Sequence, residues 1–160
     1  MKAPLINNDI KYALEKRITG ELKAELMYRT LSAKMQYEGY FGTAEYFAKE
    51  AVNEASHAQK LINFCNDMGV LPSIESYPNP IESGDTLKDV FKQAFDAEYD
   101  LYEAYSQLYK GMGDPIVSQF LLFFLEEQRT AVGEYGDFLA TLEQCGDDKG
   151  ALLLFDKNLG

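Results

Sequence analysis

Hydrophobic side chains recur at steps of three and four residues over four long segments of the chain. This spacing places them on one face of an α-helix. The four segments are about 8–38, about 43–68, 86 to about 111, and 115 to about 146. A shorter apolar stretch, GALLLFDKNL, predicts a final helix at about 150–159. The pattern therefore predicts an all-α protein in which the four long helices share one core.

The ends of these segments carry residues that start or stop helices. Thr86, followed three residues later by Asp89, is typical of a capped helix start, and so is Asp114 followed by Pro115. Glycines at 39 and 42 separate the first two segments. Because the first and third connections are short, at about four residues each, we expect each pair of helices to be antiparallel neighbours.

The connection between the second and third helices is much longer. It covers 69–85, and its prolines in the stretch PSIESYPNP make a helix there unfavourable. Fully extended, it reaches about 50 Å, whereas the helices beside it are near 39 Å long. The segment can therefore run the length of the molecule, which is the topology of a four-helix bundle with one long crossover.

Each long helix has one hydrophobic face, which we call its stripe and expect to be buried. Polar side chains interrupt these stripes. Glu21 lies on the first stripe, Glu54 and His57 on the second, Glu98 on the third and Gln128 on the fourth. Counted from the short connections, Glu21 lies at about the height of Glu54 and His57, and Glu98 at about that of Gln128. We therefore expect a single polar site near the middle of the bundle.

Buried carboxylates need positive partners, and no lysine or arginine shares these stripes. A pair of metal ions supplies the missing charge and takes oxygen and imidazole ligands. Glu54 and His57 are spaced so that both project from one helix face, and His57 is the single histidine of the chain. The pattern thus predicts a dinuclear metal site.

Composition narrows the class of protein. With 160 residues, of which 46% are hydrophobic, the chain suits one domain over 1–160. Acidic residues outnumber basic ones by 26 to 15 without a basic cluster, which argues against nucleic acid as a partner. The longest apolar run, 120–125, is too short for a membrane span. We expect a cytoplasmic protein with reduced thiols, because the start of the chain has no signal-peptide core and only two cysteines occur.

With these motifs the chain resembles the ferritin family, specifically the non-haem bacterial ferritins. The resemblance rests on ELKAELMYRTLSAKM, FAKEAVNEASHAQKL, DAEYDLYEAY, FLEEQRTAV and GALLLFDKNL, in that order. It implies a ferritin-like four-helix bundle with a long crossover and a short fifth helix. It also implies ferroxidase activity, in which iron(II) is oxidised by dioxygen, and storage of iron(III) mineral in a homo-oligomeric shell of 24 subunits.

The resemblance further implies two non-haem iron ions per subunit. Glu21 and His57 would hold the first iron, Glu54 would bridge both, and Glu98 would hold the second. Gln128 falls beside the second iron as a further candidate metal ligand, and the tyrosine that the family places near this centre corresponds to Tyr28. Gln128 and Tyr28 are therefore candidate catalytic residues as well.

Several positions depart from related patterns. Ala55 stands where bacterioferritins carry a haem-binding methionine, so no haem is expected. A third iron site of many bacterial ferritins maps onto four positions here, most of which lack a ligand: Asn53, Glu127, Thr130 and Ala131. Glu127 is retained as a candidate metal ligand, and Glu50 with Glu134 forms a candidate transit site.

Three other interpretations stay open. A rubrerythrin-like diiron peroxidase or oxidase would need a second Glu-x-x-His, but Thr130 follows Glu127 at that spacing. A mini-ferritin of the DNA-protecting type would need a helix in the crossover, which its prolines disfavour. A metal-free helical scaffold protein would need solvated carboxylates in place of buried ones.

Overall fold

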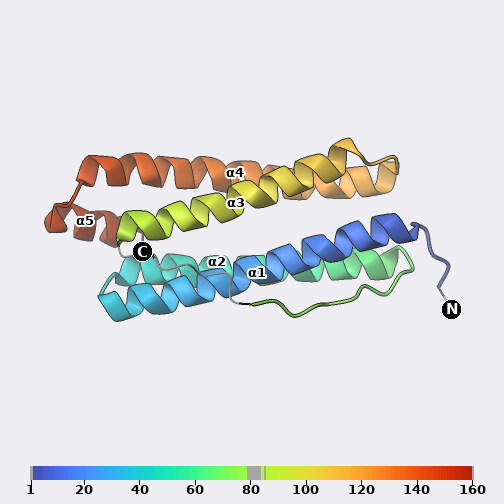
Figure 1. Ribbon diagram of the computed structural model, residues 1–160, viewed down its shortest axis with the longest axis horizontal. Coiled ribbons are helices and arrows are strands. Elements are labelled where there is room, and N and C mark those ends of the chain that lie inside the picture. The colour runs from blue at the N-terminus through green and yellow to red at the C-terminus, as the bar shows by residue number, and fades with distance from the viewer. Residues whose placement is uncertain (1, 79–83, 85, 160) are drawn as a thin grey trace. The chain divides into compact units, whose positions relative to one another are not determined.

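The computed structural model describes residues 2–78, 84 and 86–159, and within these residues it contains five helices and no strand. The helices are α1 (Asn8–Glu38), α2 (Phe41–Asp67), α3 (Leu87–Lys110), α4 (Pro115–Cys145) and α5 (Lys149–Leu159). The chain divides into two compact units, Met1–Ile81 and Glu82–Gly160, which we call the N-terminal and C-terminal units. Figure 1 shows α1 beside α2 in the first unit, and α3, α4 and α5 in the second.

The connection between α1 and α2 is shorter than predicted. Gly39 adopts a left-handed conformation with φ of 89°, and the backbone N–H of Tyr40 then donates to Met35 O at 2.9 Å. Because this glycine caps the C-terminus of α1 in a short turn, α2 begins at Phe41, two residues before the predicted start. Gly42 consequently lies in the first turn of α2 and does not belong to the loop.

The starts of α3 and α4 follow the predicted capping chemistry. Thr86 Oγ1 accepts from the Asp89 backbone N–H and Asp89 Oδ2 accepts from the Thr86 N–H, both at 3.1 Å, so the reciprocal cap of α3 is confirmed. Asp114 accepts from two backbone N–H groups in the first turn of α4, each at 2.9 Å. Asp148 accepts from the Ala151 N–H at 2.7 Å, and α5 begins one residue earlier than predicted.

Residues 2–5, which we call the N-terminal strap, pack against the end of α2. The Leu5 N–H donates to Met68 O at 2.8 Å. Gly69 has φ of 79°, and a Cβ there would lie only 2.2 Å from Ala3 O. The position therefore requires glycine for both its conformation and its contact. As a result, the crossover leaves α2 from a fixed backbone position.

The described part of the crossover, 69–78, contains no helix, as its prolines predicted. The Ser73 N–H donates to Glu15 Oε1 at 2.9 Å, which ties this segment to α1. The rest of the predicted crossover falls largely on 79–83 and 85, which lie outside the described residues.

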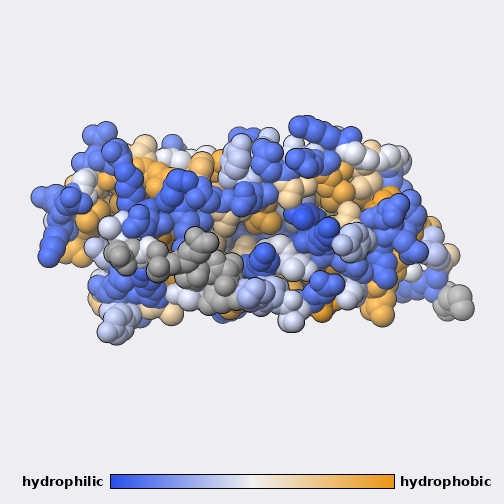
Figure 2. All heavy atoms as spheres, viewed as in Figure 1, coloured by the Kyte–Doolittle hydropathy of each residue, from blue (hydrophilic) through white to orange (hydrophobic). Residues whose placement is uncertain are grey.

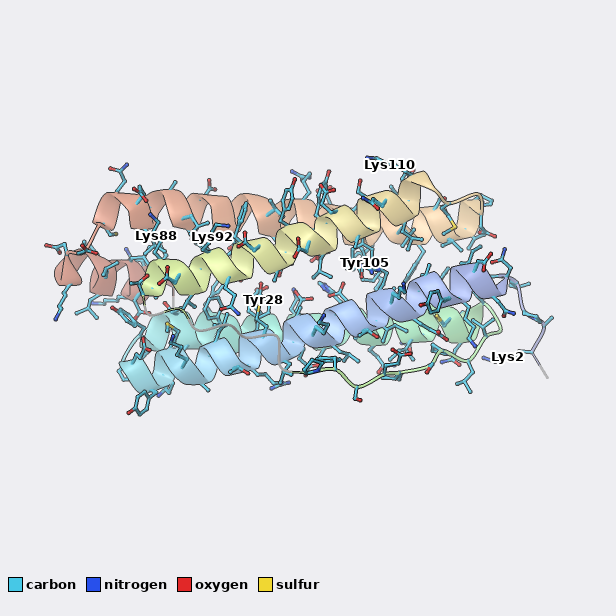
Figure 3. All side chains as sticks on the ribbon, in the orientation of Figure 1. Lys2, Tyr28, Lys88, Lys92, Tyr105 and Lys110 are labelled. Atoms are coloured by element: carbon cyan, nitrogen blue, oxygen red, sulfur yellow. The ribbon has the colours of Figure 1, made fainter. Side chains whose placement is uncertain are left out.

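Both units bury the predicted stripes. In the N-terminal unit, α1 and α2 bury Leu14, Ile18, Leu31, Met35, Phe47, Ala51, Ala58 and Leu61. In the C-terminal unit, Tyr105 of α3 (Figure 3) stacks on Phe124 of α4 with ring centroids 4.9 Å apart. Phe155 holds α5 to the α3–α4 pair, because its ring meets those of Phe91 and Phe138 edge to face at 5.3 and 6.0 Å.

The surface is largely polar on the face shown in Figure 2, with hydrophobic side chains scattered among hydrophilic ones. Lys88 and Lys92, on the first two turns of α3 (Figure 3), are exposed, and Lys88 forms an ion pair with Glu143 of α4. Among the described helices, none is long and apolar enough to cross a membrane.

Candidate metal centre

Three ligand-bearing side chains meet between α1 and α2. Glu21 comes from α1, and Glu54 and His57 come from α2 one turn apart. Their exposed fractions are 0%, 2% and 4%. Each offers a ligand atom within 4.8 Å of the other two. The structure thus brings together three of the predicted metal ligands, and we call this group the α1–α2 half-site.

The imidazole of His57 is oriented toward both carboxylates of this half-site. Its Nδ1 lies 3.3 Å from Glu54 Oε2 and 3.7 Å from Glu21 Oε2. An imidazole nitrogen and carboxylate oxygens directed toward one another can all bind the same metal ion. Two carboxylates and a neutral imidazole would leave two negative charges, so the half-site suits a cation with two or more positive charges.

A second polar pair lies between α3 and α4 in the C-terminal unit. Gln128 Nε2 donates to Glu98 Oε2 at 2.7 Å and to Glu98 backbone O at 3.1 Å. Both residues are 1% exposed. The heights counted from the sequence are therefore confirmed within this helix pair, as they are between α1 and α2. We call Glu98 and Gln128 the α3–α4 half-site.

Buried acidic groups outnumber buried basic ones in the described part of the chain. Its buried polar residues are Glu21, Thr43, Glu54, His57, Glu98, Gln128 and Asp156. This set contains no lysine or arginine. Buried carboxylates that lie close together repel one another when ionised, and a bound metal ion offsets that repulsion. The donor set therefore fits the predicted metal chemistry.

The remaining predicted residues lie around these two groups. Tyr28 is fully buried, extends from α1 (Figure 3), and packs its ring against that of Phe47 with centroids 5.6 Å apart. Glu50, one turn before Glu54 on α2, is half-buried, and so is Glu127 beside Gln128 on α4. Glu134 is exposed. Metal-binding roles for Glu50, Glu127 and Glu134 stay predictions.

The sequence pattern missed two buried polar residues, Thr43 and Asp156. Thr43 lies in the first turn of α2, where the predicted helix had only just begun. Asp156 lies in the apolar tail segment that forms α5. A single polar residue inside an apolar run carries no spacing signal, so neither was distinguishable from a surface residue.

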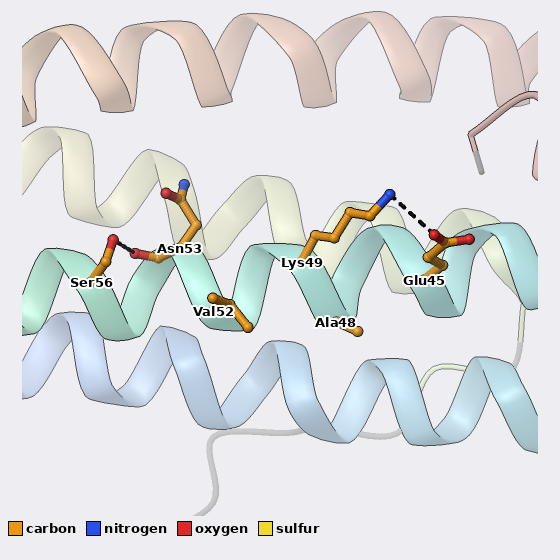
Figure 4. A pocket seen from close by; sticks show the side chains of 6 residues that line it. All are labelled: Glu45, Ala48, Lys49, Val52, Asn53 and Ser56. Carbon is orange, nitrogen blue, oxygen red and sulfur yellow. Dashed lines mark hydrogen bonds and ion pairs between the residues drawn. The ribbon is translucent and has the colours of Figure 1, made fainter.

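A shallow depression lies on a different face of α2 (Figure 4). Its lining residues are Glu45, Ala48, Lys49, Val52, Asn53 and Ser56. Lys49 forms an ion pair with Glu45 at 3.1 Å, and Ser56 Oγ donates to Asn53 O at 2.7 Å. Asn53 is exposed on this face, apart from the buried α1–α2 half-site.

Known proteins resemble this chain over nearly its whole length. A bacterial non-heme ferritin of Staphylococcus aureus is 26% identical over 159 residues, which are 98% of this chain and 96% of the relative. The protein of the same name from Staphylococcus epidermidis is 25% identical and covers 97% and 95%. Among solved structures, an open pore ferritin from Archaeoglobus fulgidus superposes with a TM-score of 0.93 at 22% identity, covering 96% of each chain.

The fold and the α1–α2 half-site define an all-α protein with a buried carboxylate–histidine group suited to a metal ion. A family model for the ferritin-like domain matches residues 11–145. The chain belongs to the ferritin family. The predicted fold class, a ferritin-like four-helix bundle with a long crossover and a short fifth helix, is confirmed.

Proposed function

We propose that this ferritin-family chain is an iron-storage protein with ferroxidase activity, which oxidises iron(II) with dioxygen and stores the iron(III) product in a multisubunit shell. The observation that carries the proposal is the buried group of Glu21, Glu54 and His57 between α1 and α2. The relatives named bacterial non-heme ferritins support the same function. Iron(II) and dioxygen are the substrates.

Each site residue has a proposed role. Glu21 and His57 hold the first iron ion, Glu54 bridges the two ions, and Glu98 binds the second with Gln128 beside it. The proximity of Glu21, Glu54 and His57 within the N-terminal unit supports the first assignment. We propose two iron ions per subunit, and no haem, because Ala55 offers no side-chain ligand where haem-binding relatives carry methionine.

The donor chemistry supports oxidation in the proposed site. Carboxylate oxygens are hard donors that favour iron(III) over iron(II), and an imidazole nitrogen also suits iron. Two iron(II) ions would give up one electron each, and these two electrons would reduce one dioxygen to the level of peroxide. Because Glu21, Glu54 and His57 are almost fully buried, they bind the ion away from bulk water. The buried phenol ring of Tyr28 lies two turns after Glu21 on α1 and is proposed to pack beside the centre.

Assembly and location complete the proposal. Large hydrophobic side chains are exposed on several helices of the described chain. They include Leu153 and Leu154 of α5, whose exposed fractions are 55% and 59%. Exposed apolar surface of this kind is typical of contacts between subunits. We propose that residues 1–160 form one domain, that identical copies assemble into a shell of 24 subunits, and that the protein acts in the cytoplasm.

Aerobic loading with iron(II) tests this function. We expect oxygen uptake that depends on iron(II), a particle mass of hundreds of kilodaltons, and retention of iron after desalting. Glu45→Gln, on the same helix as Glu54, should behave like the unmodified protein, because Glu45 is exposed and forms an ion pair with Lys49 one turn away. No iron-dependent oxygen uptake would refute the ferroxidase, whereas a monodisperse monomer or dimer would refute the shell.

A further inference from the structure

The amide group of Gln128 contacts Glu98 at two atoms. Its Nε2 lies 2.7 Å from Glu98 Oε2 and 3.1 Å from Glu98 backbone O. A carboxylate oxygen and a carbonyl oxygen are both acceptors, so the NH₂ group of Gln128 must face Glu98. The orientation of this buried amide therefore follows from the chemistry of its neighbours.

These two hydrogen bonds fix the side chain of Glu98 relative to its own helix. One amide group bridges the main-chain carbonyl and the carboxylate of the same residue. The bond to Oε2 is the shorter of the two, at 2.7 Å against 3.1 Å. It leaves Glu98 Oε1 as the carboxylate oxygen that does not face the amide.

We propose that Gln128 is a positioning residue, which orients Glu98 so that one oxygen binds the second iron, and that Gln128 does not itself bind that iron. This inference rests on the proposed function and departs from the expectation that Gln128 is a metal ligand. The α1–α2 half-site offers ligand atoms from three residues, but the α3–α4 half-site offers one oriented carboxylate. The affinity for the second ion then depends on how firmly Gln128 holds Glu98.

Zinc binding measures this dependence without any oxidation step. The full-length protein is titrated with Zn²⁺ against a chromophoric chelator, which reports the two dissociation constants per subunit separately. In Gln128→Met the donor is lost but the length of the side chain is kept. We expect the second zinc ion to bind roughly 10- to 100-fold more weakly, as when other groups that orient a metal ligand are removed, and the first to be unchanged.

A matched control separates this effect from general repacking of α4. Leu121 is fully buried seven residues before Gln128 and so lies on the same face of the helix. Leu121→Met should leave both zinc dissociation constants unchanged. If Gln128→Met does not fold, Gln128→Asn replaces it, because the shorter amide is polar but cannot reach Glu98. The same weakening is expected.

A second background distinguishes positioning from direct ligation. Glu98→Asp keeps a carboxylate but withdraws it by one methylene, beyond hydrogen-bond reach of the Gln128 amide. If Gln128 acts through Glu98, adding Gln128→Met in this background has no further effect on the second zinc ion. An equal weakening in both backgrounds would instead make Gln128 a ligand in its own right and overturn the inference.

The remaining outcomes are also decisive. Two zinc ions bound by the unmodified protein, with no weakening in Gln128→Met, would refute the positioning role alone. A single zinc ion bound by the unmodified protein would refute the proposed two-metal site, and the role of Gln128 with it.

Discussion

Replacing Glu54 by glutamine tests the centre most directly, because Glu54 is the proposed bridge between both metal ions. The substitution keeps the shape of the side chain and removes one anionic ligand from each ion. Even the loss of a group that only orients a ligand costs about 10- to 100-fold in affinity or activity, so rapid oxidation should fall by more than about 100-fold.

The metal-free protein should keep its stability in this variant. Glu21 and Glu54 offer oxygens within 4.8 Å of each other, and two unit charges at that distance repel by about 3.5 kcal/mol at an effective dielectric constant of about 20. The lost contact to His57, at 3.3 Å, offsets about 1.5–3 kcal/mol of this relief. The difference stabilises the metal-free protein by about 0.5–2 kcal/mol, which raises Tm by roughly 1–8 °C.

Two measurements check these values. Stopped-flow absorbance after mixing with aerobic iron(II) gives the oxidation rate, and thermal unfolding with a chelator present gives the stability of the metal-free protein. Glu45→Gln on the exposed side of α2 serves as the control for both. Oxidation at the unmodified rate would remove Glu54 from the mechanism, and a large loss of metal-free stability would show that the two carboxylates do not repel each other.

Four further predictions concern other parts of the chain. Ala131 is half-buried and lies three residues after Gln128, so Ala131→Glu should add an anionic ligand and tighten the weaker iron(II) site in anaerobic titration; an unchanged affinity would place Ala131 outside the site. Gly69→Ala should lower Tm more than Gly39→Ala. Both glycines have positive φ, so alanine costs about 1–2 kcal/mol at either position, but only a Cβ at position 69 also meets Ala3 O. Equal losses of Tm would contradict the contact between Gly69 and the N-terminal strap. Burial and the nearby Glu15 raise the pKa of the Cys65 thiol to about 11. At pH 8 a thiol reagent should therefore label the half-buried Cys145 before Cys65, and Cys145→Ser should abolish this early labelling. Because the folded pKa of Cys65 is raised, its contribution to stability is complete below about pH 9 and is lost as the pH rises toward 11; a flat stability profile in that range would contradict it.

The sequence predicted the four long helices well because each has a long apolar stripe, and because α3 and α4 also begin at caps that act locally. The reciprocal cap of Thr86 and Asp89 needs only four consecutive residues, and it is present as predicted. The start of α2 was wrong by two residues, because it depends on the left-handed conformation of Gly39 and a hydrogen bond from Tyr40. Conformation at a glycine is not visible in a hydrophobic pattern.

The candidate site was predictable to the level of helix faces and heights. Spacing alone indicated that Glu54 and His57 share a face and that Glu21 lies level with them. The direction of the Gln128 amide was not predictable, because it depends on which atoms of Glu98 it meets. Side-chain hydrogen bonds between helices are decided by rotamers, which a sequence pattern does not specify.

The N-terminal strap has a practical consequence for engineering the chain. Foreign peptide inserted directly after Met68 would separate Gly69 from Ala3 and pull apart a contact in which no side chain takes part. A few residues further on, the backbone is accessible, with Leu71 and Ile74 exposed by 78% and 57%, although the Ser73 N–H is engaged by Glu15. An epitope or affinity peptide should therefore be inserted near Glu75 and Ser76. The described chain is exposed there, and the contact between Gly69 and Ala3 lies several residues earlier in the sequence.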